Sequence, residues 1–204
     1  FYCLRGVRGI LDASQIEEAI RPDDHHFPVT RLICLENTHN RGGGSIYPID
    51  KMAEIYRLAK SKGLLVHLDG ARLWNASVAT GISPHEYGQW ADSVSVCLSK
   101  GLGAPIGSLV AGSRIFIDRV HRFRKMFGGG MRQVGIIASA GLYALDHHIE
   151  RLKTGLQIAE AMKPHGVLIH AFGKTQIRLV THLDITEEDI EVALNIFEKV
   201  LGRK

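Results

Sequence analysis

Residues 64–72 read Leu-Leu-Val-His-Leu-Asp-Gly-Ala-Arg, an apolar run that ends in a carboxylate, a glycine and an arginine. Such a short apolar run is typical of a buried strand. Residues 93–103 repeat the pattern, because a second run leads into Lys100 and two glycines. In open α/β sheets, ligands bind beyond the carboxyl ends of the strands. Asp69 and Lys100 are therefore the first candidates for site residues.

Strands and helices alternate around the first of these runs. Residues 31–36 have the composition of a buried strand, and a loop with three consecutive glycines follows at 37–47. Pro48 then opens a helix that ends at Lys62-Gly63. One face of this helix is apolar, with Ile49, Met52, Ala53, Ile55, Tyr56 and Ala59. The β-α-β order predicts an α/β fold with a mainly parallel sheet covered by helices.

The remaining elements are shorter or less regular. We expect helices at 14–20 (with Ser14 as N-cap), 73–79, from Ser83, 113–127, 131–152 and 186–200, and strands at 94–98, 108–111 and 176–182. The strands at 94–98 and 108–111 would form a local reversal. The pattern changes near Pro164, so we expect a main domain at 1–150 and a small C-terminal piece at 151–204.

The composition describes a globular chain. It has 204 residues, of which 45% are hydrophobic, and a mean hydropathy of +0.01, which is enough for one sizeable core. No apolar run approaches the roughly 20 residues that a membrane helix needs. The net charge is +4, but the basic stretch from Arg114 to Arg132 matches no recognised nucleic-acid-binding motif. We expect neither a nucleic-acid nor a membrane partner.

Cysteines and histidines point away from disulfides and metals. The three cysteines, Cys3, Cys34 and Cys97, are odd in number and scattered. Since Cys34 and Cys97 lie in strand-like runs, we expect both to be buried and reduced, as in the cytoplasm. Among the 11 histidines, His147 and His148 are neighbours and would project about 100° apart on a helix. We expect no metal site.

The chemistry of Asp69 and Lys100 suits one cofactor. Pyridoxal phosphate needs a lysine amine for its aldehyde and a carboxylate for its pyridine nitrogen. The glycines after Lys100 would let a planar ring and its phosphate approach the backbone closely. Other interpretations remain open: Lys100 as a solvated turn lysine, Asp69 as a cap of the following helix, and Arg72 as a simple ion-pair partner of Asp69.

Five segments together resemble the low-specificity threonine aldolases. These segments occur in the family's order, at residues 35–40, 69–72, 98–108, 128–133 and 178–184. The resemblance runs from about Gly6 to Leu152 and resumes at Val167. It implies a fold-type-I pyridoxal phosphate enzyme that cleaves threonine or allo-threonine to glycine and acetaldehyde, with a partial cofactor-binding large domain and a remnant of the small C-terminal domain. Such enzymes serve threonine catabolism and glycine biosynthesis as homo-oligomers, either dimers or tetramers.

The resemblance assigns three residues to the cofactor. Lys100 matches the lysine that binds the aldehyde, Asp69 matches the partner of the pyridine nitrogen, and Arg72 matches an arginine near the ring oxygen and the substrate. These roles imply a retro-aldol cleavage, in which electrons of the bond between Cα and Cβ enter a ring that Asp69 keeps protonated.

Four further residues are assigned in the same way. His26 matches a histidine near the substrate's β-hydroxyl, and is the candidate to accept its proton. Arg178 matches the arginine that clamps the substrate carboxylate. Lys125 and Arg132, on either side of the glycine run, match cations that hold the cofactor phosphate across a subunit boundary. Taken without the resemblance, His26 is equally an exposed loop histidine, and the glycine run a plain helix break.

The chain also departs from the family. Family members carry a segment before the position of Phe1, with a phosphate-binding turn and an aromatic ring that stacks on the pyridine. Between His165 and Gly166 the sequence passes abruptly to a late part of the family pattern. We therefore expect this chain to bind the cofactor weakly and to turn over slowly. The alternatives are a non-catalytic subunit that pairs with a full-length partner and a β-eliminating lyase with the same Lys and Asp.

Overall fold

The computed structural model describes residues 1–153 and 186–201. Two compact units are present: Phe1–Cys97 with Ser108–Ile136, and Leu98–Gly107 with Ile137–Lys204. These bounds differ from the domain division expected at residue 150, which stays a prediction.

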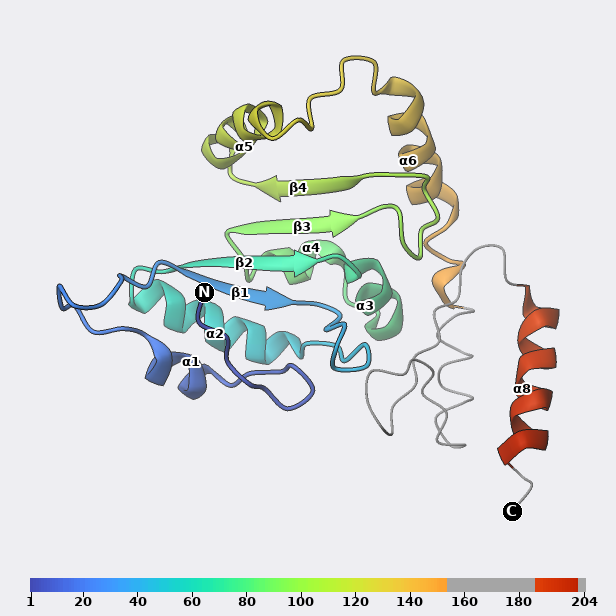
Figure 1. Cartoon of the computed structure of the whole chain (residues 1–204), viewed down its shortest axis with the longest axis horizontal. Helices are drawn as coiled ribbons and strands as arrows, with labels where there is room; N and C mark the ends of the chain where they lie inside the picture. The colour runs from blue at the N-terminus through green and yellow to red at the C-terminus, as the bar shows by residue number, and fades with distance from the viewer. Residues whose placement is uncertain (154–185, 202–204) are drawn as a thin grey trace. The chain divides into compact units, whose positions relative to one another are not determined.

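The first unit contains one four-stranded sheet in the order β1-β2-β3-β4 (Figure 1). Its strands are β1 (Leu32–Glu36), β2 (Leu65–Gly70), β3 (Ser93–Cys97) and β4 (Ser108–Gly112). The first three run parallel, and β4 pairs antiparallel with β3. The mainly parallel sheet and the local reversal at β4 confirm the prediction.

Seven described helices accompany the strands. They are α1 (Ala13–Ala19), α2 (Ile49–Ser61), α3 (Leu73–Thr80), α4 (Pro84–Gly88), α5 (Arg114–Met126), α6 (Gly135–His147) and α8 (Glu187–Leu201). α6 is shorter than predicted at both ends. Among the described residues, no helix has the length and apolar character needed to cross a membrane. The strand expected at 176–182 lies outside the described residues.

The caps of two helices can be compared with their predictions. Ser83 caps α4 and forms a capping box with Glu86, as predicted. The cap expected at Ser14 was wrong, because the N-cap of α1 lies two residues earlier. Its N-cap is Asp12, in a capping box with Gln15. Asp12 also forms an ion pair with Lys51 on α2, which favours the earlier start.

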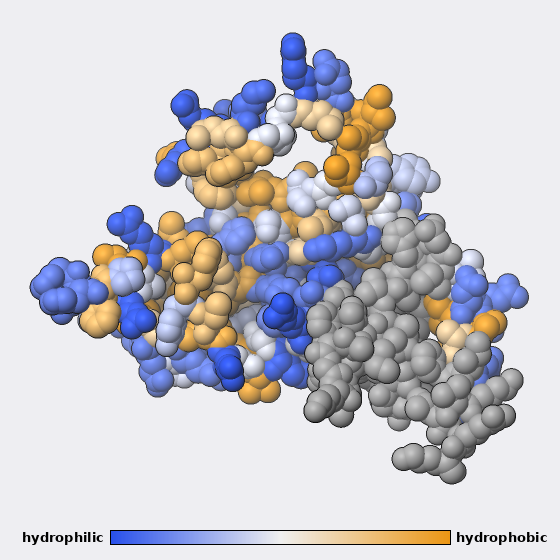
Figure 2. Space-filling view, viewed as in Figure 1, coloured by the Kyte–Doolittle hydropathy of each residue, from blue (hydrophilic) through white to orange (hydrophobic). Residues whose placement is uncertain are grey.

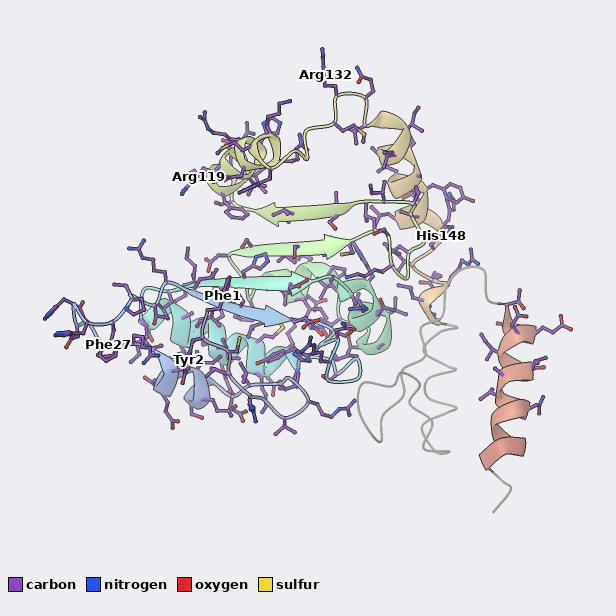
Figure 3. The ribbon with its side chains drawn as sticks, in the orientation of Figure 1. Phe1, Tyr2, Phe27, Arg119, Arg132 and His148 are labelled. Atoms are coloured by element: carbon purple, nitrogen blue, oxygen red, sulfur yellow. The ribbon has the colours of Figure 1, made fainter. Side chains whose placement is uncertain are left out.

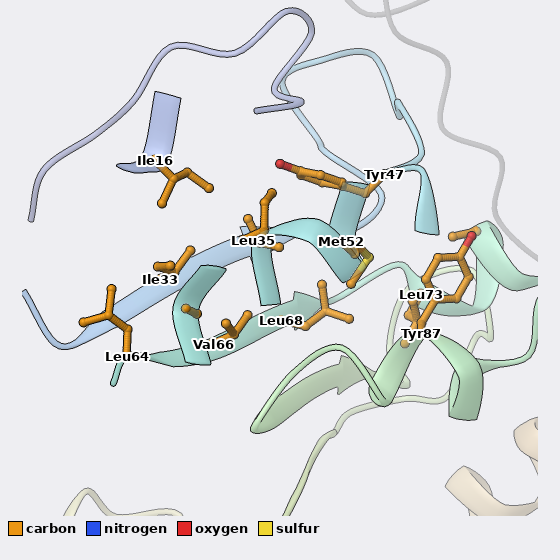
Figure 4. Packing of buried hydrophobic residues seen from close by; sticks show 13 residues of the cluster. Ile16, Ile33, Leu35, Tyr47, Met52, Leu64, Val66, Leu68, Leu73 and Tyr87 are labelled. Carbon is orange, nitrogen blue, oxygen red and sulfur yellow. The ribbon is translucent and has the colours of Figure 1, made fainter. Parts of the chain in front are cut away.

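The core lies between one face of the sheet and helices α1 to α4 (Figure 4). Val66 and Leu68 of β2 are fully buried there, as are Met52 and Ile55 of α2. The apolar positions predicted for this helix thus meet the apolar positions of the strands. Each fully buried Leu, Ile, Val or Met side chain contributes about 1.5–3 kcal/mol, so this face holds the unit together.

The opposite face of the sheet is open. Leu32 and Leu65, on this face, are 50% and 54% exposed. Cys34, two residues after Leu32 on β1, is on the same face and is also exposed, so the expectation of a buried Cys34 was wrong. Since successive strand residues alternate between faces, Ile33 and Leu35 take the core positions and leave Cys34 on the other side.

Tyr47 closes the loop that follows β1. Its ring is 1% exposed, and its hydroxyl accepts a hydrogen bond from the Leu11 N–H (2.9 Å) and donates one to the Leu11 carbonyl (3.0 Å). Its own N–H donates to Oδ1 of the buried Asn37 (3.2 Å). Burial raises the pKa of Tyr47 to about 12. The residue therefore joins the start of the chain, the end of β1 and the core.

Tyr47→Phe should lower the free energy of unfolding by about 1–3 kcal/mol, because the Leu11 N–H and carbonyl lose their partner in a partly buried position. The measurement is urea denaturation followed by circular dichroism. Tyr143→Phe on α6 is the matched control, since Tyr143 is 59% exposed. An unchanged midpoint for Tyr47→Phe would show that water replaces the hydroxyl freely.

Candidate active site

Asp69 lies near the carboxyl end of β2, in the middle of the parallel part of the sheet. Its register partners are Glu36 on β1 and Ser95 on β3. Gly70 follows it because the backbone of β3 is too close for a side chain: a Cβ there would lie 2.8 Å from the Ser95 carbonyl oxygen. The sequence Asp-Gly therefore brings a carboxylate to the sheet edge with little bulk beside it.

The carboxylate of Asp69 keeps one oxygen uncommitted. Oδ1 accepts a hydrogen bond from the Ala71 N–H (3.0 Å), and Oδ2 has no hydrogen bond or ion pair among the described residues. Helix α3 begins beyond it with Arg72 as N-cap, so Asp69 does not cap that helix. Nor does Arg72 form an ion pair with it in the described part of the chain. Among the described residues, Asp69 therefore serves neither as a helix cap nor as the ion-pair partner of Arg72.

Glu36 is a second carboxylate at the same edge. Oε1 accepts a hydrogen bond from the Asn40 N–H (3.0 Å), and Oε2 lies 3.6 Å from Nε2 of His39. Nδ1 of His39 accepts from the Gly42 N–H (2.9 Å), so the proton of a neutral ring is on Nε2, which faces Glu36. These contacts hold the loop at 37–47 in place. Both oxygens of Glu36 therefore contact its own loop, whereas Asp69 has one oxygen without a hydrogen bond among the described residues.

Lys100 comes three residues after the end of β3 and belongs to the second compact unit. Its turn is closed by hydrogen bonds from the Leu98 N–H to the Gly107 carbonyl (3.0 Å) and from the Gly103 N–H to the Lys100 carbonyl (2.8 Å). Gly103 and Gly107 have φ values of 68° and 129°, which favour glycine. The glycines of this motif therefore shape the turn. The Lys100 amine has no hydrogen bond or ion pair among the described residues.

His26 lies at the other end of the sheet. It precedes β1, in the loop whose neighbouring Phe27 is labelled in Figure 3 beside the amino ends of the strands. Asp24 Oδ1 accepts hydrogen bonds from the backbone N–H and from Nδ1 of His26, both at 2.8 Å, which lowers the pKa of Asp24. With His25, these residues bring three possible metal ligands together, but the hydrogen bonds of the turn account for their closeness.

The two predicted phosphate ligands lie elsewhere again. Lys125 is in the last turn of α5 and Arg132 follows the glycine run; both are exposed. In Figure 3 Arg132 projects beyond β4 and α5, on the far side of the sheet from β1. A Cβ at Gly130 would lie 2.8 Å from the Lys125 side chain, so this glycine lets the loop close over α5. Figure 2 shows a hydrophobic surface in the region of this helix. Phe123 and Phe127 are 44% and 85% exposed.

A single copy of the first unit therefore does not bring all of its predicted site residues together. Asp69 and Arg72 are adjacent at the carboxyl edge, whereas His26 and Arg132 are apart from them. Arg178 lies outside the described residues. Each group by itself nevertheless has the chemistry that pyridoxal phosphate needs. Among residues 1–153 and 186–201, Asp69 has an oxygen without a hydrogen bond, and Arg72 and the Lys100 amine have no ion pair.

Reasoning from sequence missed His67, which lies two residues before Asp69 on the same open face. Nδ1 of His67 is 2.8 Å from Oγ of Ser93, and Nε2 is 3.5 Å from Oγ of Ser95. Strand alternation was the available signal, because positions 67 and 69 share a face.

Comparison with known proteins gives consistent relatives. Residues 3–188 match the family described as beta-eliminating lyases. The Escherichia coli K12 low-specificity L-threonine aldolase is 39% identical over 91% of this chain and 65% of its own length. The Arabidopsis thaliana low-specificity L-threonine aldolase 1 is 34% identical over 95% of this chain and 66% of its own. The chain spans 57–66% of the lengths of the first relatives that it matches.

Solved structures share the fold. Leishmania major threonine aldolase superimposes with a TM-score of 0.78 over 97% of this chain and 69% of its own, at 16% identity. An N-acetylornithine aminotransferase from Stenotrophomonas maltophilia has a TM-score of 0.60 over 94% of this chain and 60% of its own, at 17% identity. These likenesses confirm the predicted α/β fold.

The Cys34 thiol reports on the charge of Asp69. Partial burial, and after it the negative charge of Asp69, raise the pKa of this thiol. Asp69→Asn should therefore lower the Cys34 pKa while leaving it above the ordinary value, because partial desolvation of the thiol, the larger cause, remains. The measurement is the pH dependence of alkylation in a chain with Cys3 and Cys97 replaced by Ser. Asp50→Asn on α2 is the control, and equal Cys34 pKa values for all three chains would contradict the account.

Proposed function

Because this chain belongs to the beta-eliminating lyase family, we propose that it is a pyridoxal-phosphate-dependent aldehyde-lyase that cleaves L-threonine and L-allo-threonine to glycine and acetaldehyde. The observation that carries the proposal is the carboxylate of Asp69, exposed at the carboxyl end of a central parallel strand with one oxygen uncommitted. The strand beside it leads to Lys100. The printed names of the relatives support the choice of substrate.

Three residues of the chain would hold the cofactor. Lys100 would bind its aldehyde, Asp69 would accept a hydrogen bond from the ring nitrogen and keep it protonated, and Arg72 would lie at the ring oxygen. When bound, the cofactor supplies an electron sink for the bond that breaks. Uncommitted Oδ2 of Asp69 suits this role, because it can accept the hydrogen bond of the ring nitrogen while Oδ1 keeps its bond from the Ala71 N–H.

The substrate would be held at both ends. The guanidinium of Arg178 would bind the carboxylate in a bidentate manner, which orients the bond between Cα and Cβ. His26 would take the proton from the β-hydroxyl. Since His26 lies at the amino edge of the sheet in its own chain, this role requires a second copy of the chain to bring it to the site.

The same geometry favours a homo-oligomer. Lys125 and Arg132 lie away from Asp69 on the surface beyond β4, where the two exposed cations suit a phosphate. The N–H groups of Gly128 and Gly129 are not part of this site, because they donate to the carbonyls of Lys125 and Arg124. We propose that they bind the cofactor phosphate of a neighbouring subunit, in a dimer or tetramer. We further propose a cytoplasmic location, supported by three free cysteines.

The chain should bind pyridoxal phosphate, with a visible absorption band that Lys100→Ala abolishes, and release glycine and acetaldehyde from L-threonine. Absorption spectra and product analysis are the measurements. Lys153→Ala is the matched control, because Lys153 is an exposed lysine of the second unit that forms an ion pair with Glu150. Products of β-elimination would favour that chemistry instead. Folded protein without a band would favour a non-catalytic chain.

Subunit mixing tests the shared site. Lys100→Ala should be inactive, because it removes the amine that would bind the cofactor aldehyde. Arg132→Ala should be much less active, because loss of a charge-assisted hydrogen bond to the phosphate costs about 1.5–3 kcal/mol. Refolded together, they should regain activity, since a mixed pair holds one site with Lys100 from one chain and Arg132 from the other. Separate refolding of each variant is the control. If the mixture were no more active than the separately refolded variants, Lys100 and Arg132 would belong to a site within one subunit.

A further inference from the structure

His67 stands behind Asp69 on the open face of the sheet. The side chains of β2 alternate, so Val66 and Leu68 enter the core, while Leu65, His67 and Asp69 share the other face. Ser93 and Ser95 lie on the same face of β3, as the register partners of His67 and Asp69. His67 is partly buried in this position, so its ring is held among side chains of the sheet.

Both ring nitrogens of His67 face a hydroxyl. Nδ1 is 2.8 Å from Oγ of Ser93, its register partner, and Nε2 is 3.5 Å from Oγ of Ser95, the register partner of Asp69. A neutral imidazole donates at one nitrogen and accepts at the other. If Nε2 is unprotonated, the Ser95 hydroxyl donates its hydrogen bond to His67. If Nε2 carries the proton, His67 donates to Ser95, and the Ser95 hydroxyl can donate to another acceptor on the same face, such as the carboxylate of Asp69.

We propose that His67 is a positioning residue for Asp69, acting through the hydroxyl of Ser95. By accepting or donating at Nε2, His67 sets the direction of that hydroxyl, and so decides whether Asp69 receives a hydrogen bond beside its cofactor contact. This inference rests on the proposed function, because it concerns how Asp69 meets the ring nitrogen.

Two substitutions of His67 separate its two hydrogen bonds. His67→Asn retains a polar group near the position of Nδ1 and keeps only the link to Ser93. His67→Gln retains one near the position of Nε2 and keeps the link to Ser95. A merely structural role would make both variants alike, whereas the proposal makes them differ. His85→Gln on α4 is the matched control, because His85 is exposed and faces neither serine.

The test measures pyridoxal phosphate affinity and the visible absorption spectrum of the bound cofactor as a function of pH, in the full chain. His67→Asn should weaken binding about fivefold, the value of one hydrogen bond of roughly 1 kcal/mol, and shift the spectrum. His67→Gln should stay close to the parent. Ser95→Ala should show the same loss of affinity and the same spectral shift as His67→Asn. Combining the two substitutions should cause no further change, because both residues act through the same hydrogen bond.

Each other result is decisive. Equal losses in His67→Asn and His67→Gln, or an unchanged affinity and spectrum in His67→Asn and Ser95→Ala, would overturn the role of His67 while leaving the proposed function intact. A parent chain that binds no pyridoxal phosphate would overturn the proposed function and this inference together. Urea denaturation of each variant establishes that the compared proteins are folded.

Discussion

The alternation of β2 between two faces is the constraint on which the rest of the structure depends. Val66 and Leu68 are fully buried against α2 and set the register of the strand within the sheet. A slip of one residue would expose both and turn Asp69 into the core, where an unpaired carboxylate is too costly to keep. The packing that stabilises the unit therefore also directs His67 and Asp69 outward.

Glycines shape the backbone next to two of the proposed site residues. Gly70 allows the backbone of β3 to approach directly behind Asp69, and Gly103 and Gly107 supply the positive φ values of the turn that carries Lys100. The carboxylates of Asp69 and of its register partner Glu36 differ in how many hydrogen-bond partners they have. Glu36 is tied to its own loop, while Asp69 retains a free oxygen. One edge thus carries two carboxylates, of which only Asp69 has an oxygen ready for a ligand.

The parallel strands could be predicted because each is a short apolar run, and α4 because Ser83 and Glu86 form a local capping box. The start of α1 was ambiguous in the sequence, because Asp12 with Gln15 and Ser14 with Glu17 both have the spacing of a capping box. The ion pair of Asp12 with Lys51, far along the chain, favours the first of these starts. Which face Cys34 takes depends on the helices that cover β1. His26 lies at the amino edge of the sheet because it precedes β1, and all three parallel strands begin at that edge. The contacts of His67 with Ser93 and Ser95 exist because β2 pairs with β3. The order of the motifs therefore predicted the family and the candidate residues. Which of these residues lie close together could be seen only from the register of the strands.

The central claim is that Lys100 carries the cofactor at the carboxyl edge that Asp69 occupies. The most direct measurement is to incubate the chain with pyridoxal phosphate, reduce it with borohydride so that the bond to the amine becomes permanent, and locate the modified lysine by peptide mass spectrometry. The account predicts one major modification, at Lys100, that Asp69→Asn diminishes. Modification spread over surface lysines, or concentrated at Lys125, would contradict it.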